Sequence, residues 1–194
     1  MKIVLAMDSF KGSLTAAEAC RAAAAGLQSV IPAAQVERKP MADGGEGTAQ
    51  AVMASMGGEW RPREVMGPLP GRRVVAGYAW FPGERMAVVE MASASGITLL
   101  KREELNPLKT TTYGTGELIR AALEAGPRRI LLALGGSATV DGGVGMAQAL
   151  GWRALDSSGH PVELGGAALE QIDRMEAPAG LAAPPVDALV DVTN

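Results

Sequence analysis

The sequence predicts an α/β protein with a sheet that is at least partly parallel. Strand-like apolar runs alternate with helix-like runs over the first 58 residues, which is the pattern of strand–helix–strand units. Further on, the near-continuous apolar run Arg129–Leu134 is typical of a parallel strand that is buried on both faces. The chain has 194 residues, of which 47% are hydrophobic, so it can build one good core or one domain and part of another.

The first 58 residues contain two strand–loop–helix units. Thr15 and Glu18 have the spacing of a capping box, so the first helix is expected to begin at Thr15. A glycine pair provides the stop after the second helix. The expected elements are a strand at Lys2–Met7, a helix from Thr15 to about Val30, a strand at Gln35–Lys39, a loop at Asp43–Thr48 and a helix that ends before Gly57.

From residue 59 onward the pattern changes. Three strand-like runs are separated by short turns rich in Gly and Pro, and they are expected to pair as antiparallel strands. A second lobe is therefore expected to begin here. The expected elements are strands at Glu59–Met66, Arg72–Trp80 and Arg85–Met91, a helix at Thr115–Ala125, the strand Arg129–Leu134, a short helix to about Leu150, a hairpin at Trp152–Val162, a linker at Ala177–Pro185 and a last strand at Val186–Val192.

Composition excludes several functional classes. The net charge is −3 without a basic stripe, and aromatic residues make up only 4%, so nucleic-acid binding is not expected. The single cysteine, Cys20, cannot form a disulfide within the chain. No apolar run approaches the roughly 20 residues of a membrane span, and the first residues are too short for a signal peptide. A soluble cytoplasmic protein is expected.

Three glycine-rich loops share one design, because each follows a strand-like run and contains charged residues. In doubly wound sheets, ligands bind at the carboxyl ends of the strands, where helix N-termini and glycine loops present N–H groups to anions. We therefore expect the three loops to lie on one edge of one sheet and to share an anionic ligand, although ordinary turn chemistry could explain any one of them. The loops are Asp8–Ser13, Asp43–Thr48 and Gly135–Gly143.

The same loops also contain carboxylates, which are unfavourable beside a phosphate unless a cation lies between them. Mg²⁺ fills this role, since it binds one or two carboxylates together with phosphate oxygens and water. Phosphoryl transfer uses this combination of N–H donors, a lysine and a metal ion. Neither a Walker A sequence nor a dinucleotide fingerprint after the first strand is present. The carboxylates are Asp8, Asp43, Glu46 and Asp141.

Two further segments, Ala92–Gly96 and Thr110–Gly116, are rich in hydroxyl groups and small residues. They could let a ligand approach the backbone, although capping of the next helix by Thr115 is the alternative for the second segment. One histidine and one cysteine do not provide a zinc site of the usual kind, so His160 is assigned no role.

Together, these motifs resemble the type I glycerate kinase family, which forms 2-phosphoglycerate from glycerate and ATP. The resemblance covers Met1–Asn194 and implies two α/β lobes, one flavodoxin-like (doubly wound) and built from distant segments, the other mixed and similar to the restriction-endonuclease core. It divides the chain into residues 1–58, as the first part of the flavodoxin-like lobe, and 59–194, as the second lobe or a mixture of both. The motifs are MDSFKGS, ADGGEGT, EMASASG, NPL with TTTYGTGELI, LGGSATVDGG and DVTN.

The resemblance implies a site that binds ATP, Mg²⁺ and glycerate. Asp8, Lys11 and Asp191 are the implied catalytic residues, and Asp43 and Asp191 are the implied metal ligands. Lys11 would neutralise the substrate carboxylate or the transferring phosphoryl group. The implied binding residues are Ser9, Ser13, Gly44, Gly45, Glu46, Ser95, Gly96, Thr112, Gly114, Thr115, Gly135, Gly136, Ser137, Asp141 and Gly142.

Family members continue well beyond the position that matches Asn194, so the fold is expected to be incomplete at its C-terminus. This leaves alternatives to an active kinase. The chain could be a phosphate- or nucleotide-binding module without turnover, or it could need a complementary C-terminal chain. A homo-oligomer is also open, whereas nucleic acid and membrane are not expected partners.

Overall fold

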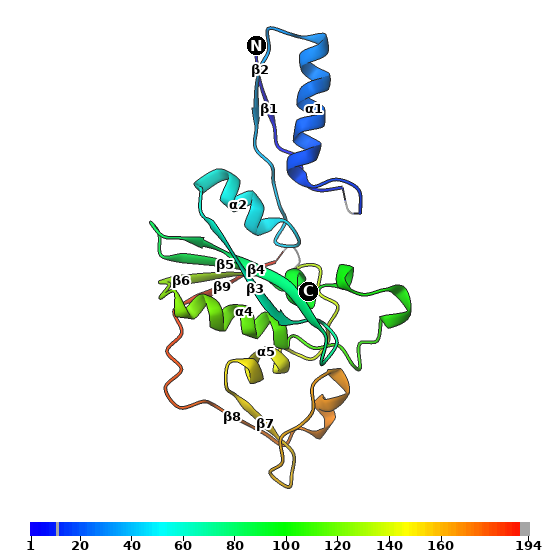
Figure 1. Ribbon diagram of the computed structural model, residues 1–194, viewed down its shortest axis with the longest axis vertical. Helices are drawn as coiled ribbons and strands as arrows, with labels where there is room; N and C mark the ends of the chain where they lie inside the picture. The colour runs from blue at the N-terminus through cyan, green and yellow to red at the C-terminus, as the bar shows by residue number, and fades with distance from the viewer. Residues whose placement is uncertain (11, 191–194) are drawn as a thin grey trace.

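The computed structural model describes residues 1–10 and 12–190 and has a mixed α/β architecture (Figure 1). Within these residues the strands form a two-stranded parallel sheet, a five-stranded mixed sheet and a two-stranded antiparallel sheet. The predicted α/β class is confirmed. Among the described residues, no helix combines the length and the apolar character needed to cross a membrane.

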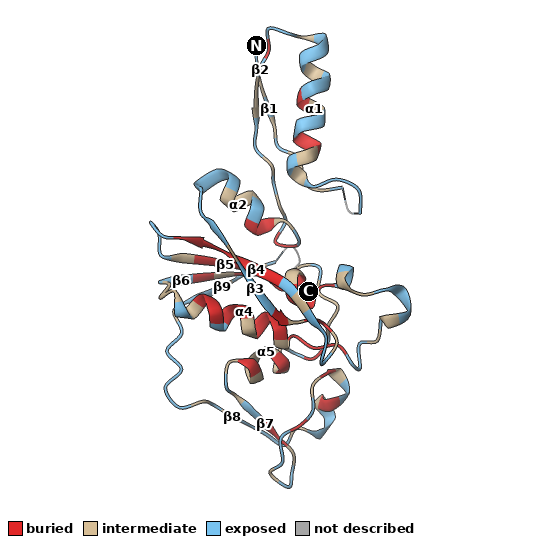
Figure 2. Cartoon of the chain, viewed as in Figure 1, coloured by how far each residue is buried: buried red, intermediate tan, exposed pale blue. Residues whose placement is uncertain are grey.

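The N-terminal residues form a small unit that projects from the larger body (Figure 1). It consists of β1 (Lys2–Leu5), α1 (Ala16–Val30) and β2 (Gln35–Arg38), and the two strands are parallel. The predicted capping box is confirmed, because the Thr15 hydroxyl accepts the Glu18 amide at 3.2 Å and the Glu18 carboxylate accepts the Thr15 amide at 2.8 Å. Only three residues of α1 are buried, so most of this helix is exposed (Figure 2).

The five-stranded sheet has the order β3-β4-β5-β6-β9. The first three strands pair as antiparallel neighbours, as predicted, and β5, β6 and β9 are parallel. The strands are β3 (Glu59–Met66), β4 (Arg73–Phe81), β5 (Met86–Glu90), β6 (Arg129–Ala133) and β9 (Val186–Leu189).

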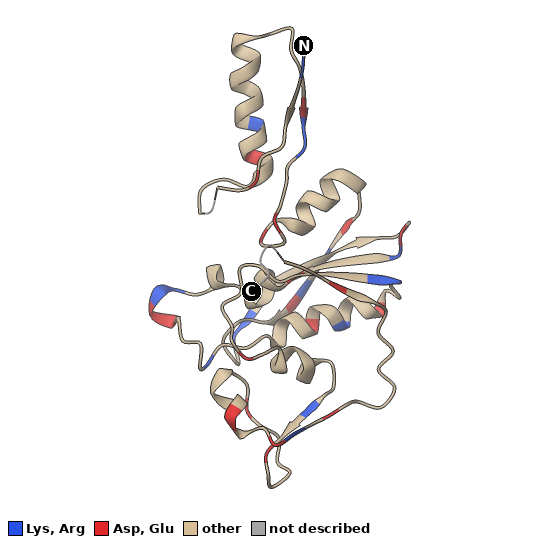
Figure 3. Ribbon diagram, turned by 180° about the vertical axis from the view of Figure 1, so that it is seen from behind, with Lys and Arg blue, Asp and Glu red and all other residues tan. Residues whose placement is uncertain are grey.

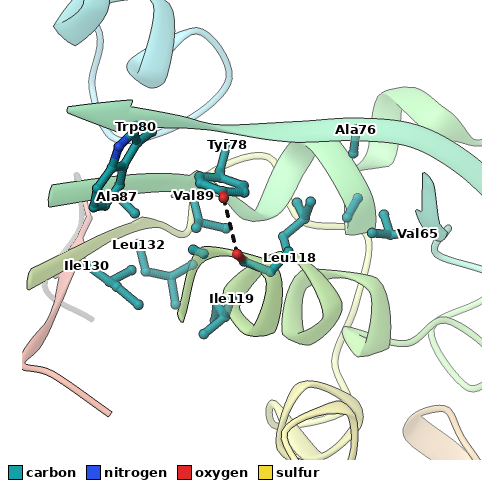
Figure 4. Close-up of a cluster of buried hydrophobic side chains, with 13 residues drawn as sticks. Val65, Ala76, Tyr78, Trp80, Ala87, Val89, Leu118, Ile119, Ile130 and Leu132 are labelled. Atoms are coloured by element: carbon teal, nitrogen blue, oxygen red, sulfur yellow. Dashed lines mark hydrogen bonds between the residues drawn. The ribbon is translucent and has the colours of Figure 1, made fainter. Parts of the chain in front are cut away.

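Helices cover both faces of this sheet. Successive residues of β4 point to opposite sides: Tyr78 and Trp80 pack in the cluster with α4 (Tyr113–Glu124), whereas Phe81 packs in the cluster with α2 (Thr48–Met56). The α4 side is the larger core, where the Tyr78 hydroxyl donates to the carbonyl of Ala121 at 3.1 Å (Figure 4). The result is a three-layer arrangement of helix, sheet and helix.

Shorter elements connect these layers. A turn of helix, α3, follows β5 directly, and α5 packs against α4 (Figure 1). These elements are α3 (Met91–Ser95), η1 (Ile97–Leu99), η2 (Arg102–Glu104), α5 (Val144–Ala149), β7 (Arg153–Leu155), η3 (Gly166–Gln171) and β8 (Arg174–Glu176).

The predicted hairpin at Trp152–Val162 contains one regular strand, β7. The chain turns after β7 and returns along one of its edges: the amides of Asp156 and Val162 donate to the carbonyls of His160 and Ala154, each at 2.9 Å, and Leu155 forms an isolated bridge with Pro161. The other edge of β7 pairs with β8, which was not predicted.

The prediction that three glycine loops lie on one edge of one sheet is wrong. The loops Asp8–Ser13 and Asp43–Thr48 follow β1 and β2, which form their own sheet, whereas Gly135–Gly143 follows β6 of the five-stranded sheet. The helix after β2 nevertheless packs on the five-stranded sheet through Ala49. A pattern of alternating elements does not determine which strands pair, because pairing depends on contacts between distant parts of the chain. The division of the lobes at residue 58 stays a prediction.

Candidate functional site

The second and third glycine loops meet at the carboxyl ends of the parallel strands. The Gly135 amide donates to the Gly44 carbonyl at 3.1 Å. A Cβ atom on Gly135 would lie 2.7 Å from the Cα atom of Gly45, and one on Gly44 would lie 2.9 Å from the Leu189 carbonyl oxygen at the end of β9. Glycine is required here because the backbones approach too closely for a side chain.

The segment after β5 joins the same cluster. Ala138 donates to the Ser95 carbonyl and Ile97 donates to the Gly136 carbonyl, each at 2.9 Å. The Ser95 hydroxyl is 2.9 Å from the Thr115 hydroxyl, and both residues are fully buried. The second and third glycine loops therefore lie together, and the segment at residues 92–96 lies against the third loop.

Asp141 occupies the centre of a buried polar network rather than the surface. It is 1% exposed, and its carboxylate accepts the amides of Thr112, Gly143 and Gly145 at 2.8, 3.1 and 3.3 Å. The hydroxyls of Thr111 and Thr112 donate to it as well. The carboxylate therefore ties the third loop to the first turns of α4 and α5.

Glu90, at the end of β5, was not predicted from the sequence. It is 3% exposed, and its carboxylate accepts the amide of Ala49 at the start of α2. Desolvation raises the pKa of the Glu90 carboxyl above its usual value, and nearby Glu46 adds to this, while hydrogen bonds from the Ala49 and Gly47 backbone act in the opposite direction. A carboxylate at the end of an apolar strand, directly before a run of small residues, was the available signal.

The first glycine loop follows β1 of the two-stranded parallel sheet. Asp8 is exposed, and its carboxylate accepts the Ser9 amide at 2.6 Å. The parallel pairing continues beyond the strands, since Lys39 donates to Leu5 at 2.8 Å and Met41 donates to Met7 at 2.9 Å. Figure 1 shows that the chain leaves β1 at the end of the small sheet that is nearer the five-stranded sheet.

The predicted site residues fall into three groups. Lys11 and Asp191 lie outside the described residues. An accessible group consists of Asp8, Ser9, Ser13, Asp43, Glu46, Gly135, Gly136, Ser137 and Gly142, which are exposed or half-buried. A buried group consists of Gly44, Gly45, Ser95, Gly96, Thr112, Gly114, Thr115 and Asp141.

The accessible group contains both anion donors and carboxylates. The amides of Gly136 and Ser137 donate no hydrogen bond to another described residue. Asp43 is exposed, and one of its oxygens accepts the Gly45 amide at 3.0 Å. In the described part of the chain, no three His, Cys, Asp or Glu side chains form a metal-binding group. Acidic and basic residues are interspersed along the chain (Figure 3).

In three-layer α/β folds, glycine loops gathered at the ends of parallel strands are a common place for ligands to bind. The chain belongs to the glycerate kinase family, whose model matches residues 3–194.

Named relatives agree with this assignment. The chain is 51% identical to the glycerate kinase of Bacillus subtilis, covering 89% of this chain and 45% of that protein. It is 45% identical to the glycerate 2-kinase of Escherichia coli, covering 91% and 46%. A crystal structure from Salmonella typhimurium LT2, provisionally named glycerate kinase 2, matches with a TM-score of 0.81 and 44% identity over 97% of this chain and 52% of that one. The chain thus spans about half the length of these relatives.

Proposed function

We propose that the protein to which this chain belongs is a cytoplasmic glycerate 2-kinase that uses ATP and Mg²⁺. The observation that carries the proposal is the meeting of the second and third glycine loops with the end of β9, in a chain of the glycerate kinase family. These loops supply the backbone donors that a phosphate needs.

The accessible backbone of the third loop is the proposed phosphate cradle. The Gly136 and Ser137 amides have no acceptor among the described residues, and Gly136 has a φ of 78°. That conformation suits glycine and exposes neighbouring N–H groups to one side. The buried Asp141 carboxylate accepts amides of Thr112 and Gly143 and so anchors this loop, which would hold the loop amides in position before a ligand binds.

The carboxylates have a separate proposed task. Asp43 fits a magnesium ligand because it is exposed and has an oxygen without a partner among the described residues. Asp191, which lies outside the described residues, is proposed as a second ligand. ATP with Mg²⁺ would supply the phosphoryl group and neutralise its charge. Asp8 or Asp191 is proposed to orient the glycerate hydroxyl and receive its proton. Lys11 is proposed to neutralise the substrate carboxylate or the transferring phosphoryl group.

The test uses the protein at the length of its relatives, with ADP formation measured as a function of glycerate. Lys11→Ala is expected to lower kcat/KM about 10- to 100-fold, because a charge-assisted contact contributes about 1.5–3 kcal/mol. The melting temperature should hardly change. Turnover of hexoses or polyols without turnover of glycerate would refute the substrate, and an unchanged kcat/KM would remove Lys11 from the site.

A second candidate is a phosphate-binding module without turnover. It is favoured by one observation: the contacts between the second and third loops form entirely within this chain. Calorimetry of the 194-residue chain with ATP and with inorganic phosphate tests it. Binding without ADP formation, together with inactivity of the longer protein, would favour the module over the kinase.

A further inference from the structure

Glu90 is a buried carboxylate without a cationic partner among the described residues. It is 3% exposed and is absent from the ion pairs of residues 1–10 and 12–190. Burying a charge is costly unless hydrogen bonds compensate for the lost water. The compensation here comes from backbone N–H groups, above all the amide of Ala49, which is 41 positions away in the sequence.

The start of α2 explains why those amides need an acceptor. The N-cap residue of α2 is Gly47, with a φ of 92°, and it has no side chain to cap the helix. The first N–H groups of a helix lack partners within the helix and carry a partial positive charge. Because Ala49 is 0% exposed, water cannot satisfy its amide, and Glu90 takes the place of the missing cap.

The first turn of α2 is continuous with the second glycine loop. The Thr48 hydroxyl donates to the Gly45 carbonyl at 2.8 Å, and Gly44 accepts the Gly135 amide of the third loop at 3.1 Å. If Ala49 moved, Thr48 would move with it, and this would disturb the hydrogen bond between Gly44 and Gly135 that joins the two loops. Glu90 lies on the central strand β5, which fixes this point to the sheet.

We propose that Glu90 is a positioning residue that caps α2 from β5 and thereby holds the loop Asp43–Thr48 against the loop Gly135–Gly143. The inference rests on the proposed function for its catalytic consequence only. Glu90 acts through the two loops and does not touch the substrate, because it is buried and its carboxylate faces the α2 backbone.

Hydrogen exchange of the 194-residue chain tests the positioning without any activity assay. Glu90→Gln keeps a neutral acceptor, and Glu90→Ala removes it. Exchange at the Ala49 amide should be slowest in the wild type, intermediate in the Gln variant and fastest in the Ala variant. The whole range should be about 10- to 100-fold, since hydrogen bonds to charged groups are the stronger ones. The Val88 amide in β5 should change little.

Glu117 provides a control, because its carboxylate also accepts a backbone amide, that of Met66, but it contacts β3 and Arg73 of β4 and not the start of α2. Glu117→Gln should leave exchange at Ala49 unchanged. Equal exchange at Ala49 in the wild type and both Glu90 variants would overturn the proposal. So would a parallel rise at Ala49 and Val88, or unfolding of the Gln variant, since either result would assign Glu90 to the core.

Kinetics of the protein at the length of its relatives test the consequence. Glu90→Ala should lower kcat/KM for glycerate about 10- to 100-fold, Glu90→Gln should restore most of it, and Glu117→Gln should remain near the wild type. A loss of the same size in the Glu117 variant would overturn the positioning role. If the wild type does not turn over glycerate, the proposed function fails, and the exchange experiment still decides the role of Glu90.

Discussion

Replacing Asp141 by Ala removes the acceptor at the centre of the buried network behind the third glycine loop. The carboxylate is 1% exposed and accepts hydrogen bonds from three backbone amides and two hydroxyls. The side chain of Ala can accept none of these bonds. The hydroxyls can rotate toward other acceptors, but the amides of Thr112, Gly143 and Gly145 are fixed by the backbone.

The magnitude follows from those three amides. A buried donor left without an acceptor costs about 1–3 kcal/mol. Three such donors give a loss of at least about 3 kcal/mol, and neighbouring losses do not add fully, so we expect about 3–5 kcal/mol in the free energy of unfolding. For a chain of this size, this corresponds to a fall of about 6–20 °C in the melting temperature.

Urea unfolding followed by circular dichroism is the assay, with Asp173→Asn as the control. Asp173 is an exposed carboxylate, so its variant should remain within about 0.5 kcal/mol of the wild type. A loss below about 1 kcal/mol for Asp141→Ala would refute the reasoning, because the network would then contribute no more than an ordinary surface contact.

Three further outcomes are expected from helices and from pH. Gly114→Ala should destabilise the protein by several kcal/mol, because the new Cβ atom would overlap the Met66 carbonyl oxygen. Gly26 lies on α1 with open space around it, so Gly26→Ala should stabilise that helix by about 0.5–1 kcal/mol. Urea unfolding of the two variants and the wild type measures both changes. Thr15→Ala should cost about 1 kcal/mol by removing the capping box, seen as faster hydrogen exchange confined to the first turn of α1. Because burial raises the pKa of Glu90, its contribution to stability is complete below the usual pKa of glutamate and is lost as the pH rises through the raised value. The stability of the wild type relative to Glu90→Gln should fall across that interval, and a difference independent of pH would contradict the assignment.

Local signals in the sequence were reliable where the structure depends on neighbouring residues. The capping box at Thr15 and Glu18 predicted the start of α1, and the strand-like run Glu59–Met66, followed by a turn rich in Gly and Pro, predicted β3 with the same bounds. Both features depend on residues that are close together in the sequence. The glycines of the second and third loops were also informative, since their close approach leaves no room for a side chain.

Features that depend on distant contacts could not be predicted in the same way. The pairing of β1 with β2 in a separate sheet, and of β7 with β8, is decided by packing across the chain. The burial of two carboxylates could not be predicted either. Asp141 was predicted to lie in a ligand-binding loop, but it is buried. Glu90 caps a helix whose first turn is 41 positions away in the sequence. Asp and Glu are seldom fully buried, so a sequence alone predicts that such a side chain is exposed unless its hydrogen-bond partners are known.

Phosphorus NMR of the reaction product tests the central claim most directly. The protein at the length of its relatives would be incubated with glycerate, ATP and Mg²⁺. If it is a glycerate 2-kinase, the phosphate of the product is attached to the carbon that bears a single hydrogen, and its proton-coupled signal should be a doublet. A triplet would place the phosphate on the terminal CH₂ group, and the absence of any glycerate-dependent phosphoester would contradict glycerate as the substrate.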